Sequence, residues 1–449
     1  MDLGFAKRFP SVYIVFVVIS HCEVITMKNQ RIIGIVATVA VVIIVLIAGL
    51  MYYGSNGNSP VKGEPLAIDT YATEESVALL SEAMDGFSFD LYAQLSNGTD
   101  QGNLFFSPYS VFVALAMTYE GASGDTADEM AAVLHVPQGN ETMLCSFGRI
   151  YNLLNQDKEY TLSTANALWM KEGYPFLQSY LDYIDHYYMG KATPVNFSDA
   201  SGATALINQW IEEQTKEKIK DLIAEGDIHP LTALILTNAI YFKGLWTYQF
   251  DVASTMDGDF KLSSGDVIQT PMMRYAESDM CLNYSETEDV QILELPYKGD
   301  ALSMIVILPK EKDLAEIEAH LDYETFTAWK ENLTQQTVDV VFPRFTMETE
   351  FSLKDVLMAL GMRTCFSMDA DFSGMTGHQE LFIEKVRHKA FIEVTEEGTE
   401  AAAATSVHMA LKYAPSMIEF HADHPFLFLI QHKETGTILF MGRMTIPTL

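Results

Sequence analysis

The sequence is poor in cysteine and in basic residues. It has four cysteines in 449 residues, and 28 lysines and arginines stand against 60 aspartates and glutamates. A disulfide-stabilised scaffold needs a higher density of cysteine in a shorter chain, so we expect buried or half-buried thiols instead. The formal net charge of −32 repels nucleic-acid phosphates, which argues against a nucleic-acid-binding function.

The common catalytic and nucleotide-binding motifs are absent from the sequence. It contains no GxSxG, HExxH, GxGxxG or GxxxxGK[ST], so the usual hydrolase, zinc-protease, dinucleotide and P-loop signals are missing. Carboxylates are too numerous for any one pair to indicate acid–base catalysis. We therefore expect a protein that is not an enzyme and that needs no metal or cofactor.

A long apolar run lies near the N-terminus, at residues 32–53. It carries no charge and is long enough for a membrane-spanning helix, which takes about 20 residues. Lys28 and Arg31 precede it, which places the rest of the chain outside the cell by the positive-inside rule. We predict a transmembrane or signal-anchor helix here, with a cleaved signal peptide as the alternative.

The segments on either side of this run complete the predicted domain organisation. Residues 1–31 form an N-terminal leader, in which Met27 is an alternative start, so that 1–26 need not be translated. Residues 54–67 are rich in glycine, serine and asparagine and predict a flexible tether. A single folded domain is expected at 68–449, located outside the cell and either anchored or secreted.

The folded part predicts a mixture of helices and strands. Apolar residues recur every three or four positions from Val77 to Leu95, which predicts an amphipathic helix with Thr73 as its N-cap. A second helix begins at Ser107-Pro108, and a charged helix is expected at 203–224. Strand-like apolar runs lie at 160–168, 231–242, 301–308, 426–430 and 437–441. Because helices and strands do not alternate regularly, we expect one α+β domain with mixed, mostly antiparallel sheets.

The segment 396–413, EEGTEAAAATSVHMALKY, is unusual for an ordinary domain. It directly follows a strand-like run, and small side chains stand at the alternate positions Thr399, Ala401, Ala403 and Thr405. Small side chains at alternate positions suit a segment that threads between two strands of a closely packed sheet. The alternative is a helix, which the alanines favour.

Several motifs, in this order, resemble those of the serpin family: NLFFSPYS (103–110), LTNAIYFKGLW (236–246), FPRF (342–345), DFSGMT (371–376), EEGTEAAAAT (396–405), HPFLFLI (424–430) and LFMGRM (439–444). The resemblance extends over nearly all of 68–449. It implies a single-domain serpin fold with three mostly antiparallel β-sheets, about eight or nine helices and an exposed reactive-centre loop. It also implies a suicide inhibitor of serine proteases, in which the cleaved loop inserts into the main sheet while the protease is held as an acyl-enzyme.

The resemblance assigns structural roles to particular positions. Four residues match the polar cluster beneath the opening point of the main sheet, here called the shutter cluster: Ser107, Ser110, Asn238 and His388. Trp246 and Glu396 match the top of that sheet, the breach, where insertion begins. Gly398 matches the hinge glycine, and the hinge continues through Thr399, Glu400, Ala401, Ala402, Ala403 and Ala404.

The resemblance also implies a bait bond. In the family the hinge glycine is typically the fifteenth residue before the cut, so counting from Gly398 gives Lys412 and the bond Lys412-Tyr413. A lysine there suits trypsin-like proteases, whose specificity pocket holds a carboxylate. Cleavage after Leu411 or Tyr413 would indicate a chymotrypsin- or subtilisin-like target, and a non-inhibitory serpin is the other alternative. We expect a monomer whose partner is a serine protease held in a covalent complex, with membrane contact through the N-terminal helix.

Overall fold

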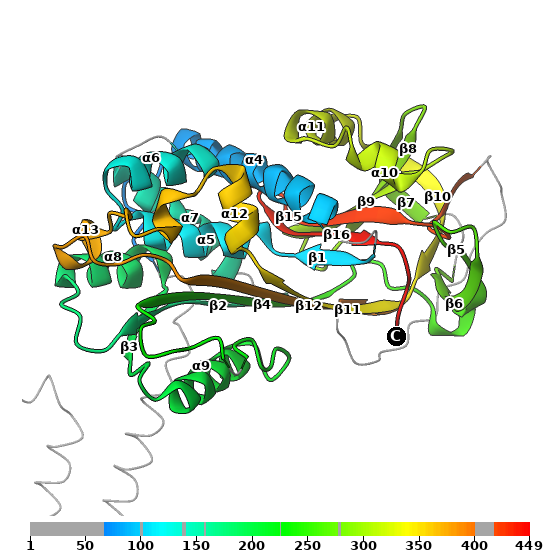
Figure 1. Ribbon diagram of the computed structural model, residues 1–449. Coiled ribbons are helices and arrows are strands. Elements are labelled where there is room, and N and C mark those ends of the chain that lie inside the picture. The colour runs from blue at the N-terminus through cyan, green and yellow to red at the C-terminus, as the bar shows by residue number, and fades with distance from the viewer. Residues whose placement is uncertain are drawn as a thin grey trace, which may run out of the picture. The chain divides into compact units, whose positions relative to one another are not determined.

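The computed structural model describes residues 67–98, 102–136, 141–156, 159–224, 226–276, 280–399 and 417–449 (Figure 1). All of them belong to the compact unit Pro65–Leu449. The predicted leader, the predicted span 32–53 and the tether up to residue 66 lie outside the described residues. Within the described part, no helix has the length and apolar character that a bilayer crossing requires.

The described part of the chain contains ten α-helices and two short 3-10 helices. The α-helices are α4 (Glu74–Gly98), α5 (Pro108–Tyr119), α6 (Gly124–Val133), α7 (Glu141–Gln156), α8 (Gln178–Tyr188), α9 (Ala200–Gln214), α10 (Leu314–Glu318), α11 (Tyr323–Glu331), α12 (Lys354–Leu360) and α13 (Ser373–Thr376); the 3-10 helices are η1 (Val252–Ser254) and η2 (Thr364–Phe366).

The strands form two hydrogen-bonded sheets. They are β1 (Leu104–Phe106), β2 (Tyr160–Lys171), β3 (Lys191–Val195), β4 (Leu234–Leu245), β5 (Met256–Lys261), β6 (Val267–Arg274), β7 (Met280–Glu286), β8 (Val290–Pro296), β9 (Leu302–Pro309), β10 (Thr334–Pro343), β11 (Phe345–Ser352), β12 (Lys385–Val394), β13 (Gly398–Thr399), β14 (Ile418–His421), β15 (Phe426–His432) and β16 (Ile438–Met444).

The larger sheet has ten strands in the order β1-β16-β15-β9-β8-β7-β10-β6-β5, with β14 paired to β10. Every residue of β9 is buried, as the continuous apolar run at 301–308 predicts. β10 pairs with β7 through its first half and with β6 through its last residues. Because β10 pairs with both β6 and β7, it links all ten strands into one sheet. The described strands therefore form two hydrogen-bonded sheets, where three were expected.

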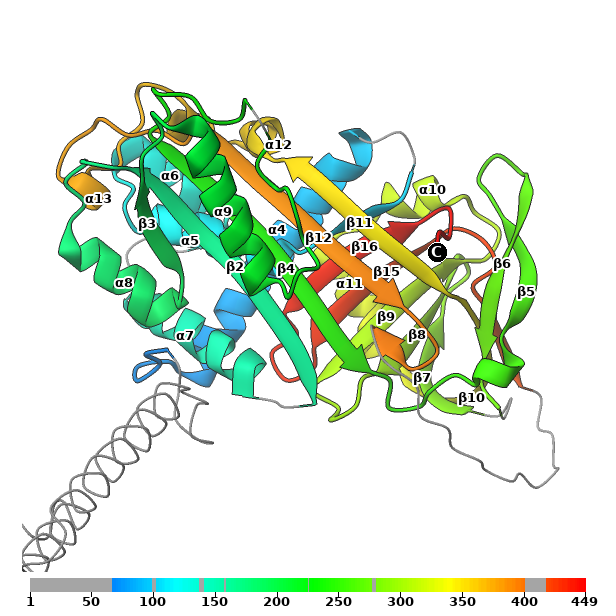
Figure 2. The same ribbon diagram turned by 90° about the horizontal axis from the view of Figure 1, so that it is seen from below.

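The second sheet has six strands in the order β11-β12-β13-β4-β2-β3, with a direct pairing of β12 to β4. The main apolar core lies on one face of this sheet, where α5 packs against β2, β4 and the larger sheet. α9 lies on the opposite face (Figures 1 and 2). The predicted α+β class is confirmed, with ten α-helices in the described residues.

The starts of the first two described helices agree with the sequence. The Thr73 hydroxyl accepts a hydrogen bond from the Ser76 N–H at 3.1 Å, and the Ser107 hydroxyl accepts from the Ser110 N–H at 3.1 Å with Pro108 following. Such side-chain oxygens satisfy backbone donors that have no partner within the helix.

The charged helix expected at 203–224 ends ten residues early, at Gln214. The Thr215 hydroxyl donates to the Ile211 carbonyl at 2.8 Å and accepts from the Ile219 N–H at 3.2 Å. Lys216 and Glu217 then adopt positive φ angles of 53° and 64°, a conformation that ends a helix. The prediction was wrong here because Ile219, Leu222 and Ile223, which follow Thr215, are buried in a core cluster with residues of β2 and β4 instead of extending the helix.

The three described cysteines are free thiols. Cys145 and Cys365 are buried, as expected, but Cys281 is exposed on β7. Burial raises the pKa of Cys365 to about 12, so this thiol stays protonated and unreactive at neutral pH.

Candidate functional site

The second sheet contains a junction between two parallel neighbouring strands, here called the seam. Residues 385–391 of β12 pair in parallel with residues 235–241 of β4, with His388 opposite Asn238. A parallel pair is slightly less stable per residue than an antiparallel one. A strand that ran antiparallel to both would therefore replace one weaker ladder by two stronger ladders.

Such a strand already begins at the top of the seam. β13 lies between β12 and β4 and is antiparallel to both: Thr399 is opposite Val394 on one side and Gly244 on the other. The Thr399 side chain is fully buried, and its hydroxyl lies 2.8 Å from the Tyr297 hydroxyl. The chain segment that follows β12 has thus entered the sheet by two residues.

Gly398 is required where the chain turns into the sheet. Its φ is +157°, and a Cβ placed on it would lie 2.2 Å from the carbonyl oxygen of Gly244 and 2.7 Å from the Cα of Leu245. Both neighbours are backbone atoms of β4 and cannot rotate away. Only glycine allows the two backbones to approach this closely.

Trp246 holds the turn that leads into β13. Its indole N–H donates to the Thr395 carbonyl at 3.0 Å, and its backbone N–H donates to the Glu397 carbonyl at 2.9 Å. The Glu396 carbonyl accepts from the Phe250 N–H at 2.8 Å. The indole also stacks on Tyr297 with 4.5 Å between ring centroids. These contacts lie around the two residues predicted for the breach, Trp246 and Glu396. The sequence analysis did not predict that the Thr395 carbonyl would accept the indole hydrogen bond.

The shutter cluster lies on the core face of the seam. His388 Nε2 accepts a hydrogen bond from the Ser107 N–H at 3.0 Å, and His388 Nδ1 is bonded to the Asn238 side-chain carbonyl. The Asn238 amide donates to the Ser110 hydroxyl at 2.5 Å, and the Ser107 hydroxyl donates to the Leu439 carbonyl at 2.6 Å. The four residues are fully buried and come from α5 and its cap, β4 and β12.

The chemistry of this cluster is structural. Burial lowers the pKa of His388 to about 3, outweighing the hydrogen bond to Asn238, so the ring is neutral. A neutral imidazole bonded as donor at Nδ1 and as acceptor at Nε2 joins β12 to β4 and to α5. The sequence prediction missed one member, Asn166 of β2, which accepts from the Ser110 hydroxyl at 2.8 Å. The one feature of the sequence that could have indicated Asn166 is a side-chain amide among the small and apolar residues of this strand.

The rest of the predicted hinge and the bait bond lie outside the described residues. They are Glu400, Ala401, Ala402, Ala403, Ala404, Leu411, Lys412 and Tyr413. The chain is described again from residue 417, and β14 then pairs in parallel with β10. The described roots of the predicted loop are therefore β13 and β14.

The second sheet thus combines a parallel pair, β12 and β4, with a two-residue strand, β13, that lies antiparallel to both at one end. A model of the family described as serpin (serine protease inhibitor) matches residues 82–447. The chain belongs to the serpin family.

Named relatives and solved structures agree. An uncharacterized serpin-like protein of Thermococcus kodakarensis is 42% identical over 371 residues, covering 81% of this chain and 85% of the relative. The leukocyte elastase inhibitor of Bos taurus is 40% identical over 377 residues, covering 82% and 99%. The crystal structure of Serpin48, described as a highly specific serpin of the insect Tenebrio molitor, superposes with a TM-score of 0.75 at 33% identity, covering 82% of this chain and 98% of that one.

Proposed function

We propose that this protein is a suicide inhibitor of trypsin-like serine proteases, with Lys412-Tyr413 as its bait bond. The single observation that supports it best is the antiparallel entry of Thr399 between β12 and β4, because a loop that has begun to insert has an open path to continue. The next alternate positions, Ala401, Ala403 and Thr405, have small side chains, which offer little steric obstacle to a new strand.

The proposed reaction uses the protease's own chemistry. The protease serine attacks the carbonyl carbon of Lys412, the Lys412-Tyr413 peptide bond breaks, and the leaving amine of Tyr413 takes a proton from the protease histidine. Lys412 is then esterified to the protease. Insertion of the freed segment at the seam moves the tethered protease away before water can hydrolyse that ester.

The test is to mix the full-length protein with an equal amount of bovine trypsin. We expect a covalent band at the summed mass on a denaturing gel and a released peptide that begins at Tyr413 by mass spectrometry. A peptide beginning at residue 412 or 414 would move the bait residue to Leu411 or Tyr413 and the target to chymotrypsin- or subtilisin-like proteases. Cleavage without a covalent band against trypsin, chymotrypsin and subtilisin would contradict the inhibitory function and leave a non-inhibitory serpin.

We further propose that residues 32–53 place the serpin domain outside the cell. The uncharged run is long enough for a bilayer and has Lys28 and Arg31 on its N-terminal side. An anchored chain should stay in the membrane pellet after an alkaline carbonate wash and be digested by protease added to intact cells. A chain found in the medium and starting near residue 54 would instead indicate a cleaved signal, and a chain found inside the cell would refute both.

A further inference from the structure

The chain contains five Asn-x-Ser/Thr sequences, the acceptor sequence for N-linked glycans. They begin at Asn97, Asn140, Asn196, Asn283 and Asn332. Three of them, at 196–198, 283–285 and 332–334, lie wholly within the described residues. A chain of this length contains several such sequences by chance, so their presentation in the fold has to distinguish them.

The acceptor sequence at Asn283 is built into the larger sheet. Asn283 lies on β7, opposite Gln335 of β10 and opposite Glu294 of β8. Its amide nitrogen, the atom to which a sugar would be joined, donates to Glu294 at 2.6 Å, and Glu294 is only 6% exposed. The Ser285 hydroxyl donates to the Trp329 carbonyl at 3.2 Å, and Ser285 is buried. In the folded chain both functional groups of this sequence are therefore occupied.

The acceptor sequence at Asn332 is exposed, but it is also bonded at both groups. The Asn332 amide nitrogen donates to the Ala328 carbonyl at 2.7 Å, at the C-terminal end of α11. This bond satisfies one of the last carbonyls of the helix. The Thr334 hydroxyl, at the start of β10, accepts from the Gln336 side chain at 3.1 Å. Modification here would have to compete with these contacts.

Asn196 is presented differently, in the turn between β3 and α9. Val195 and Phe197 on either side of it are buried in the core cluster shared with α9, whereas Asn196 and Ser198 are exposed. The Asn196 side-chain carbonyl accepts from the Ser198 N–H at 3.0 Å, and its backbone carbonyl accepts from the Asp199 N–H at 3.1 Å. The turn is thus fixed by its buried neighbours and by its own hydrogen bonds.

These contacts leave the reactive groups of this sequence free. The carbonyl branch of the planar Asn196 amide is held toward the turn, so the nitrogen branch lies on the other side. Among the described residues, neither this nitrogen nor the Ser198 hydroxyl has a hydrogen-bond partner. Of the three completely described sequences, the one at Asn196 alone combines an exposed asparagine with two unbonded functional groups.

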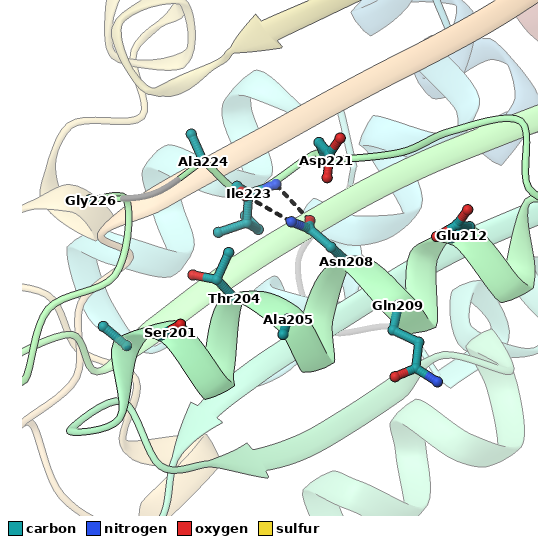
Figure 3. A pocket seen from close by; sticks show the side chains of 11 residues that line it. Ser201, Thr204, Ala205, Asn208, Gln209, Glu212, Asp221, Ile223, Ala224 and Gly226 are labelled. Carbon is teal, nitrogen blue, oxygen red and sulfur yellow. Dashed lines mark hydrogen bonds between the residues drawn. The ribbon is translucent and has the colours of Figure 1, made fainter.

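The surroundings of the turn have room for a bulky substituent. Asp199 caps α9 by accepting from the Gly202 N–H at 3.0 Å, so the start of the helix is fixed without the Asn196 amide nitrogen. A groove runs along α9 from its first residues and is lined there by Ala200, Ser201 and Thr204 (Figure 3). These small side chains leave the surface beside the start of the helix open.

The turn lies at the end of the second sheet that is remote from β13. β3 ends at Val195, opposite Lys171 of β2, whereas Tyr160 at the other end of β2 lies opposite Gly244, next to β13. At about 3.3 Å per residue, the eleven steps from Tyr160 to Lys171 span about 36 Å. A substituent on Asn196 would therefore stand well away from β13.

We propose that Asn196 is an N-glycosylation site and that Asn283 is not. The substrate is an oligosaccharide linked through a phosphate or diphosphate to a membrane lipid. The Asn196 amide nitrogen bonds to the anomeric carbon of the first sugar, and the bond from that carbon to the lipid phosphate oxygen breaks. The phosphate leaves with the electron pair, and the nitrogen gives up one proton to the transferring enzyme. This inference rests on the proposed location outside the cell, because exported chains carry this modification.

The test is to express the full-length chain in cultured human cells and to purify its folded form from the membranes, in mild detergent, and from the medium. N-glycans are then released by an amidase in heavy-oxygen water, which converts each asparagine that carried a glycan into a labelled aspartate. We expect mass spectrometry to find the label at Asn196 and none at Asn283. On a denaturing gel, Asn196→Gln should migrate faster than the parent by the mass of one glycan, and Asn283→Gln should migrate with the parent.

Two substitutions at Ser198 separate acceptor recognition from folding. Ser198→Ala keeps Asn196 but should lose its glycan, because the acceptor sequence requires the hydroxyl, and Ser198→Thr should keep the glycan. An exported chain, found in the medium or shielded from added protease inside closed membrane vesicles, but unlabelled at Asn196, would overturn the glycosylation site and leave the location outside the cell standing. A chain that added protease digests in those vesicles and that is missing from the medium would refute both. Label at Asn283 in the folded protein would contradict its protection by the sheet.

Discussion

Replacing Thr399 by arginine should convert the proposed inhibitor into a substrate of trypsin. Thr399 is fully buried between β12 and β4, with its hydroxyl against Tyr297. An arginine there would bury an unpaired charge at the first step of insertion, at a penalty of several kcal/mol. Insertion would then lose the competition with hydrolysis of the acyl-enzyme. We expect the moles of protein consumed per mole of trypsin inhibited to rise at least about a hundredfold, measured by titrating residual trypsin activity.

Thr399→Ser is the control for this substitution, because it keeps the hydroxyl and fits the same space. It should inhibit trypsin with nearly unchanged stoichiometry. In Thr399→Arg, the released peptide should still begin at Tyr413, which would show that recognition of the bait bond is intact. Near-stoichiometric inhibition by Thr399→Arg would mean that Thr399 does not stay buried during the reaction.

The arrangement of strands gives a physical reason to expect that the proposed cleavage would stabilise the fold. β12 and β4 are parallel neighbours, and the strand that begins between them is antiparallel to both. Continued insertion exchanges the single parallel ladder for two antiparallel ladders and adds a strand of small residues to the sheet. The described ends of the predicted loop are β13 in this sheet and β14 on the larger sheet, so in the proposed mechanism the exchange is completed only after the loop is cut.

Much of this site follows from local sequence patterns. The helix start at Ser107-Pro108, the buried strand β9 and a core position for His388 each need only the residues nearby. The resemblance to a family then predicted one cluster of Ser107, Ser110, Asn238 and His388. No local pattern could do this, because Ser107 and His388 are 281 positions apart in the sequence.

The parts that could not be predicted depend on contacts between distant segments. Helical periodicity and charge continue beyond Gln214, but α9 ends there, and the apolar residues Ile219, Leu222 and Ile223 pack with residues of β2 and β4 instead. In the sequence, the alternating Lys385, Arg387 and Lys389 are typical of an exposed strand face. In the structure the segment that follows α9 covers this face, and Lys389 donates to its Lys220 carbonyl. Asn166 is an amide on β2, and its role is seen only from its distant partners, since its side-chain carbonyl accepts hydrogen bonds from Ser110 and Asn238.

Replacing His388 by alanine should lower the stability of the uncut protein, because His388 joins β12 to β4 and to the start of α5. The substitution leaves the Ser107 N–H and the Asn238 side-chain carbonyl without this partner at a site that excludes water, and it opens a cavity. Two unsatisfied buried groups together with a cavity cost about 3–5 kcal/mol. We expect the thermal unfolding midpoint of the uncut protein to fall by about 4–6 °C. Ser254→Ala, which removes a half-buried hydroxyl of η1 bonded to Asp251, should change the midpoint little.

The same histidine predicts how the stability of the uncut protein depends on pH. In the folded chain the pKa of His388 is about 3, against an ordinary value of 6.5, so between these values the unfolded chain binds one more proton at this residue. The stability that the buried neutral ring provides is therefore complete above about pH 6.5 and decreases as the pH falls toward 3, by up to about 1.4 kcal/mol per pH unit. Denaturant unfolding of the parent and of His388→Gln between pH 3 and 8 isolates this contribution, because the other titrating groups are common to both. The difference in unfolding free energy should be constant above pH 7 and shrink in acid; a difference independent of pH would contradict a neutral His388 in the folded protein.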